Sequence, residues 1–189
     1  MLGGTFDPVH LGHIAVASQC RARLQLSEVR LVPSFRPPHR PPPLASAEDR
    51  LAMTRLAAAD DRGLVVDDLE VRRGGTSYSV DTLRELRQAG RRRLVLLLGY
   101  DAALEFKSWH LGADIPGLAE IVVFNRTAGA PTTPNGALPP GAVVVAVDSP
   151  DISATDVRER LAAGAETAGM LAPSVLAYIR DRGLYGAGK

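Results

Sequence analysis

Cysteine, tryptophan and long apolar runs are all scarce in this chain of 189 residues. The single cysteine, Cys20, cannot form a disulfide within the chain, so a reducing compartment, the cytoplasm, is the expected location. No stretch approaches the ~18 apolar residues of a membrane-spanning helix, and the first residues lack the layout of a secretory signal. The net charge of +1 gives no reason to expect DNA or RNA as a partner. Disulfide-stapled, membrane-embedded and nucleic-acid-binding classes are therefore disfavoured.

What is present is the composition of an ordinary globular protein. Hydrophobic residues make up 46% of the chain and charged residues 23%. This length suffices for one domain with a sizeable core, and no linker divides the chain. We therefore expect residues 1–189 to form a single domain.

Helix-like and strand-like segments alternate along the chain. Apolar periodicity predicts helices at residues 11–26, 47–59, 80–88, 156–163 and 173–182, with Ser77 or Ser79 as a cap for the third. Strands are predicted at 28–33, at 64–67 with an irregular continuation to 71, and at 93–98, 121–124 and 142–147. The last three runs are apolar enough to be parallel strands covered on both faces. This alternation predicts a doubly wound, Rossmann-like α/β parallel sheet with its ligand site at the carboxyl ends of the strands.

The most informative stretch is residues 3–13, which read GGTFDPVHLGH. Gly3 and Gly4 allow a sharp turn and a close approach of the backbone to a ligand, and a helix begins shortly after. Because a helix start presents unpaired N–H groups and the positive end of its dipole, this layout suits a phosphate. His10 and His13, three residues apart, share one helix face and can donate to phosphoryl oxygens. Half a zinc site is the alternative, but no Cys/His cluster follows.

A second candidate anion site precedes the helix predicted at 156–163. Ser153 and Thr155 are most simply helix caps, worth about 1 kcal/mol each. Two hydroxyls, a helix start and Arg158, which can grip a phosphate with two N–H groups, also form an anion cradle. Both interpretations remain open on the residues alone.

Other candidate residues have weaker signals. Gly99 ends a buried strand, and Asp101 either caps a short helix or binds a sugar. Trp109 has polar neighbours, which favours a pocket wall over the core. Residues 34–43 are too rich in proline for regular structure and predict a stiff loop that presents His39 and Arg40, unless these are only solvated charges. Residues 127–141 are interpreted as a surface connection.

Several of these motifs resemble those of a known family. Residues 3–13 are similar to the signature of the nucleotidyltransferase superfamily, in wording closest to the bacterial nicotinate-mononucleotide adenylyltransferases. Residues 152–158 resemble its second motif, Ile-Ser-Ser/Ala-Thr-x-x-Arg, and the segments at 37–40, 77–83 and 178–185 resemble further family segments. The resemblance spans nearly the whole chain.

The resemblance implies transfer of the adenylyl group of ATP, accompanied by Mg²⁺, to nicotinate mononucleotide, giving deamido-NAD and pyrophosphate in NAD biosynthesis. Catalysis would rest on His10, His13 and Arg158, with no metal site built by the protein. The residues implied for ATP and its phosphates are Gly3, Gly4, Thr5, Phe6, His10, His13, Arg40, Gly99, Asp101, Ile152, Ser153, Thr155 and Arg158. Those implied for nicotinate mononucleotide are Thr5, Phe6, Arg40, Ser79, Trp109 and His110.

Specific roles follow from the same resemblance. Asp101 would accept ribose hydroxyls, Trp109 would stack on the pyridine ring, and backbone N–H groups at Ser79 and His110 would receive the carboxylate. Nicotinamide would place an NH2 donor against one of these donors, and the buried mismatch would disfavour it. In this chain His110 stands where members of the family often carry an aromatic residue.

Two alternatives stay open. Another adenylyl or cytidylyl transferase, such as a pantetheine-phosphate adenylyltransferase, would share the two phosphate motifs. A non-catalytic nucleotide-binding protein of the same fold would be expected to lack His10, His13 or Arg158, and all three are present. The oligomeric state is not encoded in any motif, and a homo-oligomer is possible.

The first strand is short for this fold. Only Met1 and Leu2 precede Gly3, whereas a parallel strand commonly has about five residues. Losing buried apolar side chains there would cost roughly 1.5–3 kcal/mol each. We therefore predict that the first strand is truncated before Gly3 and that the natural start lies upstream.

Overall fold

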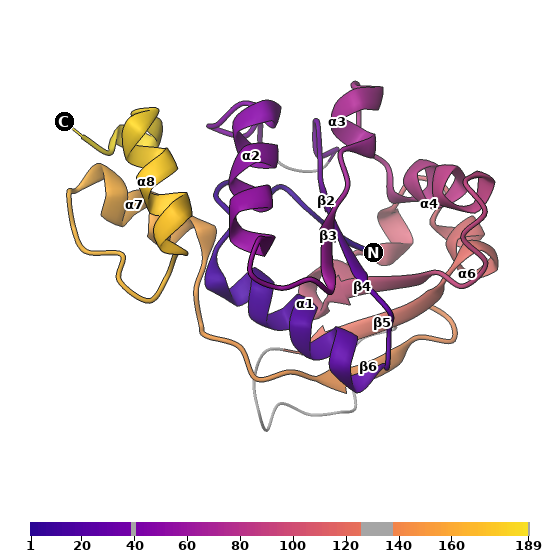
Figure 1. The fold of residues 1–189 in the computed structure, drawn as a ribbon. Helices are drawn as coiled ribbons and strands as arrows, with labels where there is room; N and C mark the ends of the chain where they lie inside the picture. Colours follow the sequence, from indigo (N-terminus) through magenta and orange to yellow (C-terminus); the bar gives the residue numbers. More distant parts are fainter. Residues whose placement is uncertain (39–40, 126–137, 189) are drawn as a thin grey trace.

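The strands form one continuous parallel arrangement in the computed structural model, which describes residues 1–38, 41–125 and 138–188 (Figure 1). They are β1 (Leu2–Gly4), β2 (Val29–Pro33), β3 (Leu64–Val66), β4 (Val95–Gly99), β5 (Glu120–Asn125) and β6 (Val143–Ala146). Two three-stranded sheets have the orders β1-β2-β3 and β4-β5-β6. Met1 joins them, because its carbonyl accepts from the Leu97 N–H at 2.9 Å and its amino group donates to the Val95 carbonyl at 2.7 Å.

The resulting strand order is β3-β2-β1-β4-β5-β6. From β1 the chain adds strands toward one edge of the sheet, and from β4 it adds them toward the other edge, so the sheet is doubly wound and the order of strands reverses between β1 and β4. In such sheets ligands bind beyond the carboxyl ends of the strands at the point of reversal. The predicted fold class is therefore confirmed. The loops that follow β1 and β4 carry the residues around Gly4 and Gly99 to that edge.

Helices cover both faces of this sheet. The helices are α1 (Leu11–Arg23), α2 (Ala47–Ala58), α3 (Leu69–Arg73), α4 (Ser79–Gln88), α5 (Tyr100–Leu104), α6 (Ile115–Leu118), α7 (Ala154–Ala162) and α8 (Pro173–Asp181). Short 3-10 turns are η1 (Phe106–Ser108), η2 (Gly112–Asp114) and η3 (Leu184–Gly186). Figure 1 shows α7 and α8 at one end of the molecule and α4 with α6 at the other.

Two apolar clusters lie on opposite faces of the sheet, and the strands supply alternate residues to each. From β4, Val95 and Leu97 belong to the cluster that contains residues of α1, α2, α7 and α8, while Leu96 and Leu98 belong to the cluster that contains residues of α4 and α6. Since side chains alternate along a strand, the nearly continuous apolar run of β4 is explained by burial on both faces.

Three sequence expectations are corrected here. Residues 69–71 form a helix, α3, because the Asp67 carboxylate accepts from the Leu69 N–H at 3.2 Å and starts a helical turn directly after β3. β6 is the edge strand of its sheet, and Val143 is 57% exposed, so this run is not covered on both faces. Neither Ser77 nor Ser79 caps α4, since Tyr78 stands at the cap position.

β1 is three residues long, and both Met1 and Leu2 are buried. The upstream start stays a prediction. Among the described residues, no helix combines the length and apolarity needed to cross a membrane.

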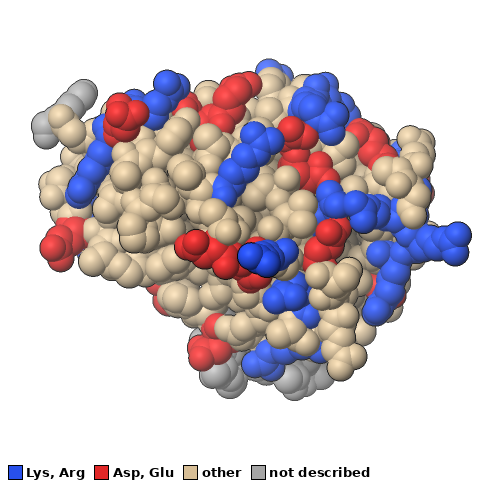
Figure 2. All heavy atoms as spheres, viewed as in Figure 1, with Lys and Arg blue, Asp and Glu red and all other residues tan. Residues whose placement is uncertain are grey.

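Charges of both signs are mixed on the surface. Figure 2 shows Lys and Arg side chains interspersed with Asp and Glu over one face of the molecule. Several of them form exposed pairs, such as Arg55 with Asp68 at 3.1 Å, and pairs of this kind contribute little to stability.

Candidate active site

The loop after β1 turns tightly around one aromatic ring. Phe6 is 2% exposed and has a positive φ of 49°, which tucks its ring beneath the backbone. A Cβ at Gly4 would lie 2.9 Å from two carbons of that ring. Only glycine fits at Gly4, because a side chain there would have to displace a buried ring.

The two histidines lie together, as the spacing predicts. His10 is 2% exposed and immediately precedes α1, and its ring stacks on that of His13 with centroids 3.6 Å apart. The His10 backbone N–H donates to His13 Nδ1 at 3.2 Å. Because Nδ1 accepts this bond, the neutral His13 ring carries its proton on Nε2. His13 can therefore act as a hydrogen-bond donor through Nε2.

Gly12 lets the stretch 3–13 pack closely against the segment that precedes α7. A Cβ at Gly12 would lie 3.0 Å from His10 Nδ1 and 3.2 Å from the Pro150 carbonyl oxygen. The segment before α7 thus passes directly over the start of α1, where any larger residue would push it away.

Arg158 joins the two motifs directly. Its Nη1 donates to the Asp7 carbonyl at 2.7 Å and its Nη2 to Thr155 Oγ1 at 3.1 Å. Ser153 Oγ accepts from the Asp156 N–H at 3.0 Å, so this serine does cap α7. The guanidinium of Arg158 therefore lies where the loop after β1 meets the start of α7.

Ile152 has a structural place in this junction. It is 6% exposed and belongs to the core cluster that also contains Phe6 and Val157. Its side chain therefore packs the motif onto the core.

Asp7 is a buried anchor for three segments. Its carboxylate accepts from the N–H groups of Leu44 at 2.8 Å and Ala45 at 3.1 Å, and from the Tyr185 hydroxyl at 2.7 Å. Burial, together with the bond to the Asp7 charge, raises the pKa of the Tyr185 hydroxyl above its usual value. Asp7 thereby ties the first loop to the start of α2 and to the C-terminal turn η3.

Arg50 is the second buried anchor. This side chain is 1% exposed, and its guanidinium donates to the carbonyls of Thr5 at 2.7 Å, Phe35 at 3.0 Å and Ala45 at 3.3 Å. Burial lowers the pKa of Arg50, against the favourable charge of Asp7. One cation thus fixes the loops after β1 and β2 relative to each other.

The residues predicted to bind the pyridine nucleotide form a neighbouring group. Ser79 is the first residue of α4, and the ring of the preceding Tyr78 lies 4.2 Å from that of His110. Trp109 is partly buried, with its ring 5.5 Å from that of Phe106. The structure therefore brings the start of α4 and the turn after η1 together.

Phe35 connects this group to the phosphate loops. Its carbonyl accepts from Arg50, and its N–H donates to Ser77 Oγ at 2.9 Å. Ser77 lies two residues before α4, so hydrogen bonds run without a break from the loop after β1 to the start of α4.

Two further predicted residues lie at the carboxyl end of β4. Gly99 is the cap residue of α5, so Asp101, in the first turn, is not its cap. Asp101 is exposed, which leaves its carboxylate accessible to a ligand. Arg40 and His39 lie outside the described residues, as does most of the surface connection predicted at 127–141.

The sequence of the chain is similar to those of known proteins. Residues 1–160 match the family model described as Cytidylyltransferase-like. A curated relative from Aeromonas hydrophila, named probable nicotinate-nucleotide adenylyltransferase, is 41% identical over 204 residues, covering 98% of this chain and 95% of the relative. A relative of the same name from Pseudomonas syringae pv. tomato is 41% identical over 206 residues, covering 99% and 93%.

The chain belongs to the nicotinate-nucleotide adenylyltransferase family.

Solved structures agree on the fold of the family. Nicotinic acid mononucleotide adenylyltransferase of Plasmodium falciparum, in complex with NaAD, matches with a TM-score of 0.78 at 16% identity, covering 98% of this chain and 95% of that one. A putative nicotinate-nucleotide adenylyltransferase from Vibrio parahaemolyticus matches with a TM-score of 0.71 at 18% identity, covering 97% and 92%. At such identities these likenesses concern the fold alone.

Sequence reasoning missed the anchors of this family member's site. The sequence shows Asp7 only as one residue of the stretch 3–13 and Tyr185 only as one residue of the segment 178–185. Arg50 had a usable signal, because it shares a helix face with Met53 and Thr54, which are also buried. An arginine at a core position of a helix indicates buried acceptors nearby.

Proposed function

We propose that this chain transfers the adenylyl group of ATP to nicotinate mononucleotide, giving deamido-NAD and pyrophosphate. The observation that carries the proposal is the junction at Arg158, which joins the loop after β1 to the start of α7 beside the stacked histidines. The two motifs that we propose bind phosphate come from opposite ends of the chain and meet at Arg158, as transfer between two phosphates requires.

The chemistry needs positioning more than proton transfer. The 5′-phosphate of the mononucleotide is already anionic and attacks the α-phosphorus of ATP in line, so no covalent intermediate or strong base is required. His13, through Nε2–H, together with His10 and Arg158, would stabilise the negative charge on the phosphoryl oxygens. Loss of one such donor costs about 3 kcal/mol, or roughly a hundredfold in rate.

Mg²⁺ fits this site as a companion of ATP. The buried carboxylate of the loop after β1, Asp7, uses both of its oxygens for Leu44, Ala45 and Tyr185. Within the described residues, no three His, Cys, Asp or Glu side chains lie close enough to form a metal site. The ion would therefore be held mainly by phosphate oxygens, and its charge would add to that of Arg158.

Recognition of the pyridine ring is assigned to the start of α4 and the turn after η1. Trp109 would stack on the ring, while N–H groups at Ser79 and His110 would donate to both carboxylate oxygens. Asp101 would accept from ribose hydroxyls, and Arg40 would meet a phosphate. The contact of Tyr78 with His110 supports this proposal, because it holds the two donor segments together.

Pyrophosphate release tests the function. Purified protein is mixed with ATP, Mg²⁺ and one acceptor at a time: nicotinate mononucleotide, nicotinamide mononucleotide or phosphopantetheine. We expect the strongest signal with nicotinate mononucleotide. A stronger signal with phosphopantetheine would support the pantetheine-phosphate alternative, and no turnover with any acceptor would support a non-catalytic nucleotide-binding protein.

The setting of the enzyme follows from the same proposal. ATP and nicotinate mononucleotide are its expected partners. A cytoplasmic location, the lack of a nucleic-acid partner and a possible homo-oligomer stay predictions. Size-exclusion chromatography with light scattering measures the oligomeric state directly.

A further inference from the structure

Glu70 is a buried carboxylate close to the proposed pyridine site that the mechanism leaves without a role. It lies on α3 and is 4% exposed. Thr82 Oγ1 donates to Glu70 Oε1 at 2.6 Å. The Ser77 side chain lies close enough to the same carboxylate to lower the pKa of Glu70. Burial raises the pKa of Glu70, while the bonds from Thr82 and Ser77 and the charge of Arg73 act in the opposite direction. Removing a carboxylate from water costs free energy, so a buried carboxylate indicates a functional or structural role.

The partners of Glu70 lie on both sides of the start of α4. Ser77 is two residues before the helix and Thr82 is in its first turn and a half. Thr82 Oγ1 also accepts from Arg73 Nη2 at 3.0 Å, and of the two acceptors of its proton Glu70, at 2.6 Å, is closer than the Tyr78 carbonyl, at 3.4 Å. Glu70 therefore acts on residues on both sides of Ser79, Ser77 before it and Thr82 after it.

Ser77 connects the start of α4 to the loop after β2 through hydrogen bonds. Its Oγ accepts from the Phe35 N–H at 2.9 Å, and its own N–H donates to the Arg36 carbonyl at 2.8 Å. These two bonds hold both the side chain and the backbone of Ser77 against the loop after β2. The direction of the backbone leading into Ser79 is fixed by the same bonds.

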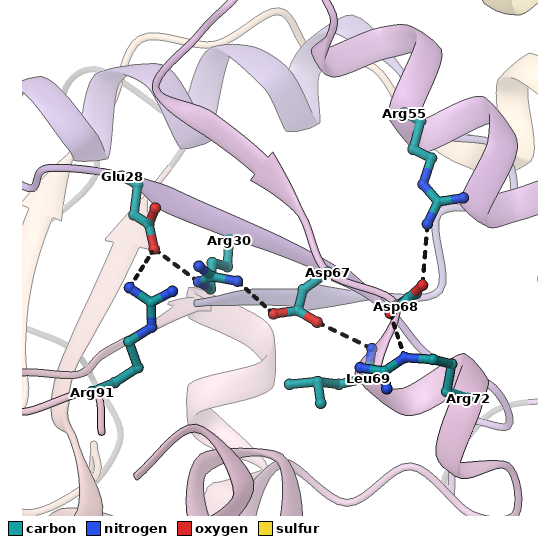
Figure 3. A network of polar contacts seen from close by, with 8 residues as sticks. All are labelled: Glu28, Arg30, Arg55, Asp67, Asp68, Leu69, Arg72 and Arg91. Atoms are coloured by element: carbon teal, nitrogen blue, oxygen red, sulfur yellow. Dashed lines mark hydrogen bonds and ion pairs between the residues drawn. The ribbon is translucent and has the colours of Figure 1, made fainter. Parts of the chain in front are cut away.

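Helix α3, which carries Glu70, is itself anchored. Figure 3 shows Asp67 between Arg30 of β2 and the Leu69 N–H, and Asp68 between Arg55 of α2 and Arg72. Arg30 donates to Asp67 at 2.7 Å and Arg72 donates to Asp68 at 2.6 Å. The carboxylate of Glu70 is thus presented from a helix held at its N-terminal end by the sheet and α2.

We propose that Glu70 is a positioning residue for recognition of the nicotinate carboxylate: by holding Ser77 and Thr82, it sets the direction of the N–H groups at the start of α4. This inference rests on the proposed function. It assigns to α3 a share in the choice of nicotinate over nicotinamide, although no residue of α3 need touch the substrate.

The test compares Glu70→Gln, Ser77→Ala and the double variant with wild type. Gln has the size of Glu but replaces one acceptor oxygen with an NH2 donor. This donor cannot accept a hydrogen bond from the hydroxyl of Ser77 or Thr82. We expect the KM for nicotinate mononucleotide to rise about tenfold and kcat to change less than about threefold, since one well-made bond is worth roughly that much. The KM for ATP should stay within about twofold of wild type, and the preference for nicotinate over nicotinamide should fall about tenfold.

Two comparisons sharpen this test. In the control Glu85→Gln, Arg73 Nη1 loses the carboxylate to which it donates at 2.5 Å, while Ser77 is unchanged. This variant should keep the wild-type KM and selectivity. The double variant Glu70→Gln/Ser77→Ala should lose no more selectivity than the more affected single variant, because both act through one contact.

A merely structural role for Glu70 gives a different pattern. Glu70→Gln would then lower the melting temperature and the active fraction while KM and selectivity stay at wild-type values, and this would overturn the inference. If Glu70→Gln does not fold, Ser77→Ala decides alone, and unchanged selectivity in that variant overturns the inference. Failure of the proposed function is distinct, because wild type itself would then form no deamido-NAD.

Discussion

At the residue scale, the position of the proton on the neutral His13 ring is defined by one hydrogen bond. Its Nδ1 accepts the His10 N–H, so Nε2 bears the proton, and the Phe6 ring meets His13 edge-on with centroids 5.0 Å apart. A donor held in this way loses little entropy when it meets a phosphoryl oxygen.

Replacing His13 with Ala should therefore lower kcat/KM by roughly a hundredfold, the usual effect of removing one donor to a developing charge. Initial rates of pyrophosphate release measure this effect. Ser18→Ala, on the same helix and bonded to Asp61, is the control and should retain wild-type rates. A His13→Ala enzyme as fast as wild type would remove this histidine from the mechanism.

Arg50 acts on stability as well as on geometry. Its buried guanidinium donates to three carbonyls, and each buried carbonyl left without a donor costs about 1–3 kcal/mol.

Arg50→Met keeps the apolar stem and removes the donors. We expect the free energy of unfolding to fall by about 3 kcal/mol or more, with loss of activity because Thr5 and Phe35 are released. Urea unfolding followed by circular dichroism measures the change. A loss below about 0.5 kcal/mol, the range of ordinary surface substitutions, would show that these bonds do not stabilise the loops.

At the scale of elements, the C-terminal helix α8 is held to α2 by one carboxylate. Asp49 of α2 accepts from the Tyr178 hydroxyl at 2.8 Å, from Ser46 Oγ at 2.8 Å and from Arg182 at 3.1 Å. Burial alone would raise the pKa of Asp49, but these bonds and the Arg182 charge outweigh burial and lower the pKa below its usual 3.8.

This direction gives a pH dependence with a defined sign. A carboxyl whose pKa is lower in the folded state contributes stability above its unfolded pKa, and the contribution is lost as the pH falls through the folded pKa. Wild type should therefore be more stable than Asp49→Asn at pH 6, and the difference should shrink steadily as the pH falls below 3.8. Urea unfolding of both proteins from pH 2 to 6 measures it. A difference that does not change with pH would contradict the account of α2 and α8.

The sequence predicted most elements because their patterns are local. Strand β4 is an unbroken apolar run, and α2 has Ser46 as its cap, with the Asp49 N–H donating to Ser46 Oγ at 3.0 Å. The helix α3 was missed because Val71 and Leu69 favour a strand by composition, and the Asp67 side chain that starts the helix acts through geometry. Edge exposure of β6 was missed because its composition is that of a buried strand while its position depends on sheet order.

At the scale of the whole molecule, the site is assembled from distant segments. The motif residues were visible in the sequence because each carries its own chemistry. Their junction was not, since the bond from Arg158 to the Asp7 carbonyl depends on how β1 and α7 meet across the fold. Asp7 and Arg50, which hold this junction, are recognised only from their buried partners.

The central claim is that this assembled site joins ATP to nicotinate mononucleotide and selects the acid. A competition assay tests it most directly: the enzyme, ATP and Mg²⁺ are mixed with equal concentrations of nicotinate and nicotinamide mononucleotides, and the dinucleotides are separated and identified by mass spectrometry. We predict deamido-NAD as the main product, with pyrophosphate in equal amount. NAD in equal or greater yield, or no dinucleotide at all, would contradict the account.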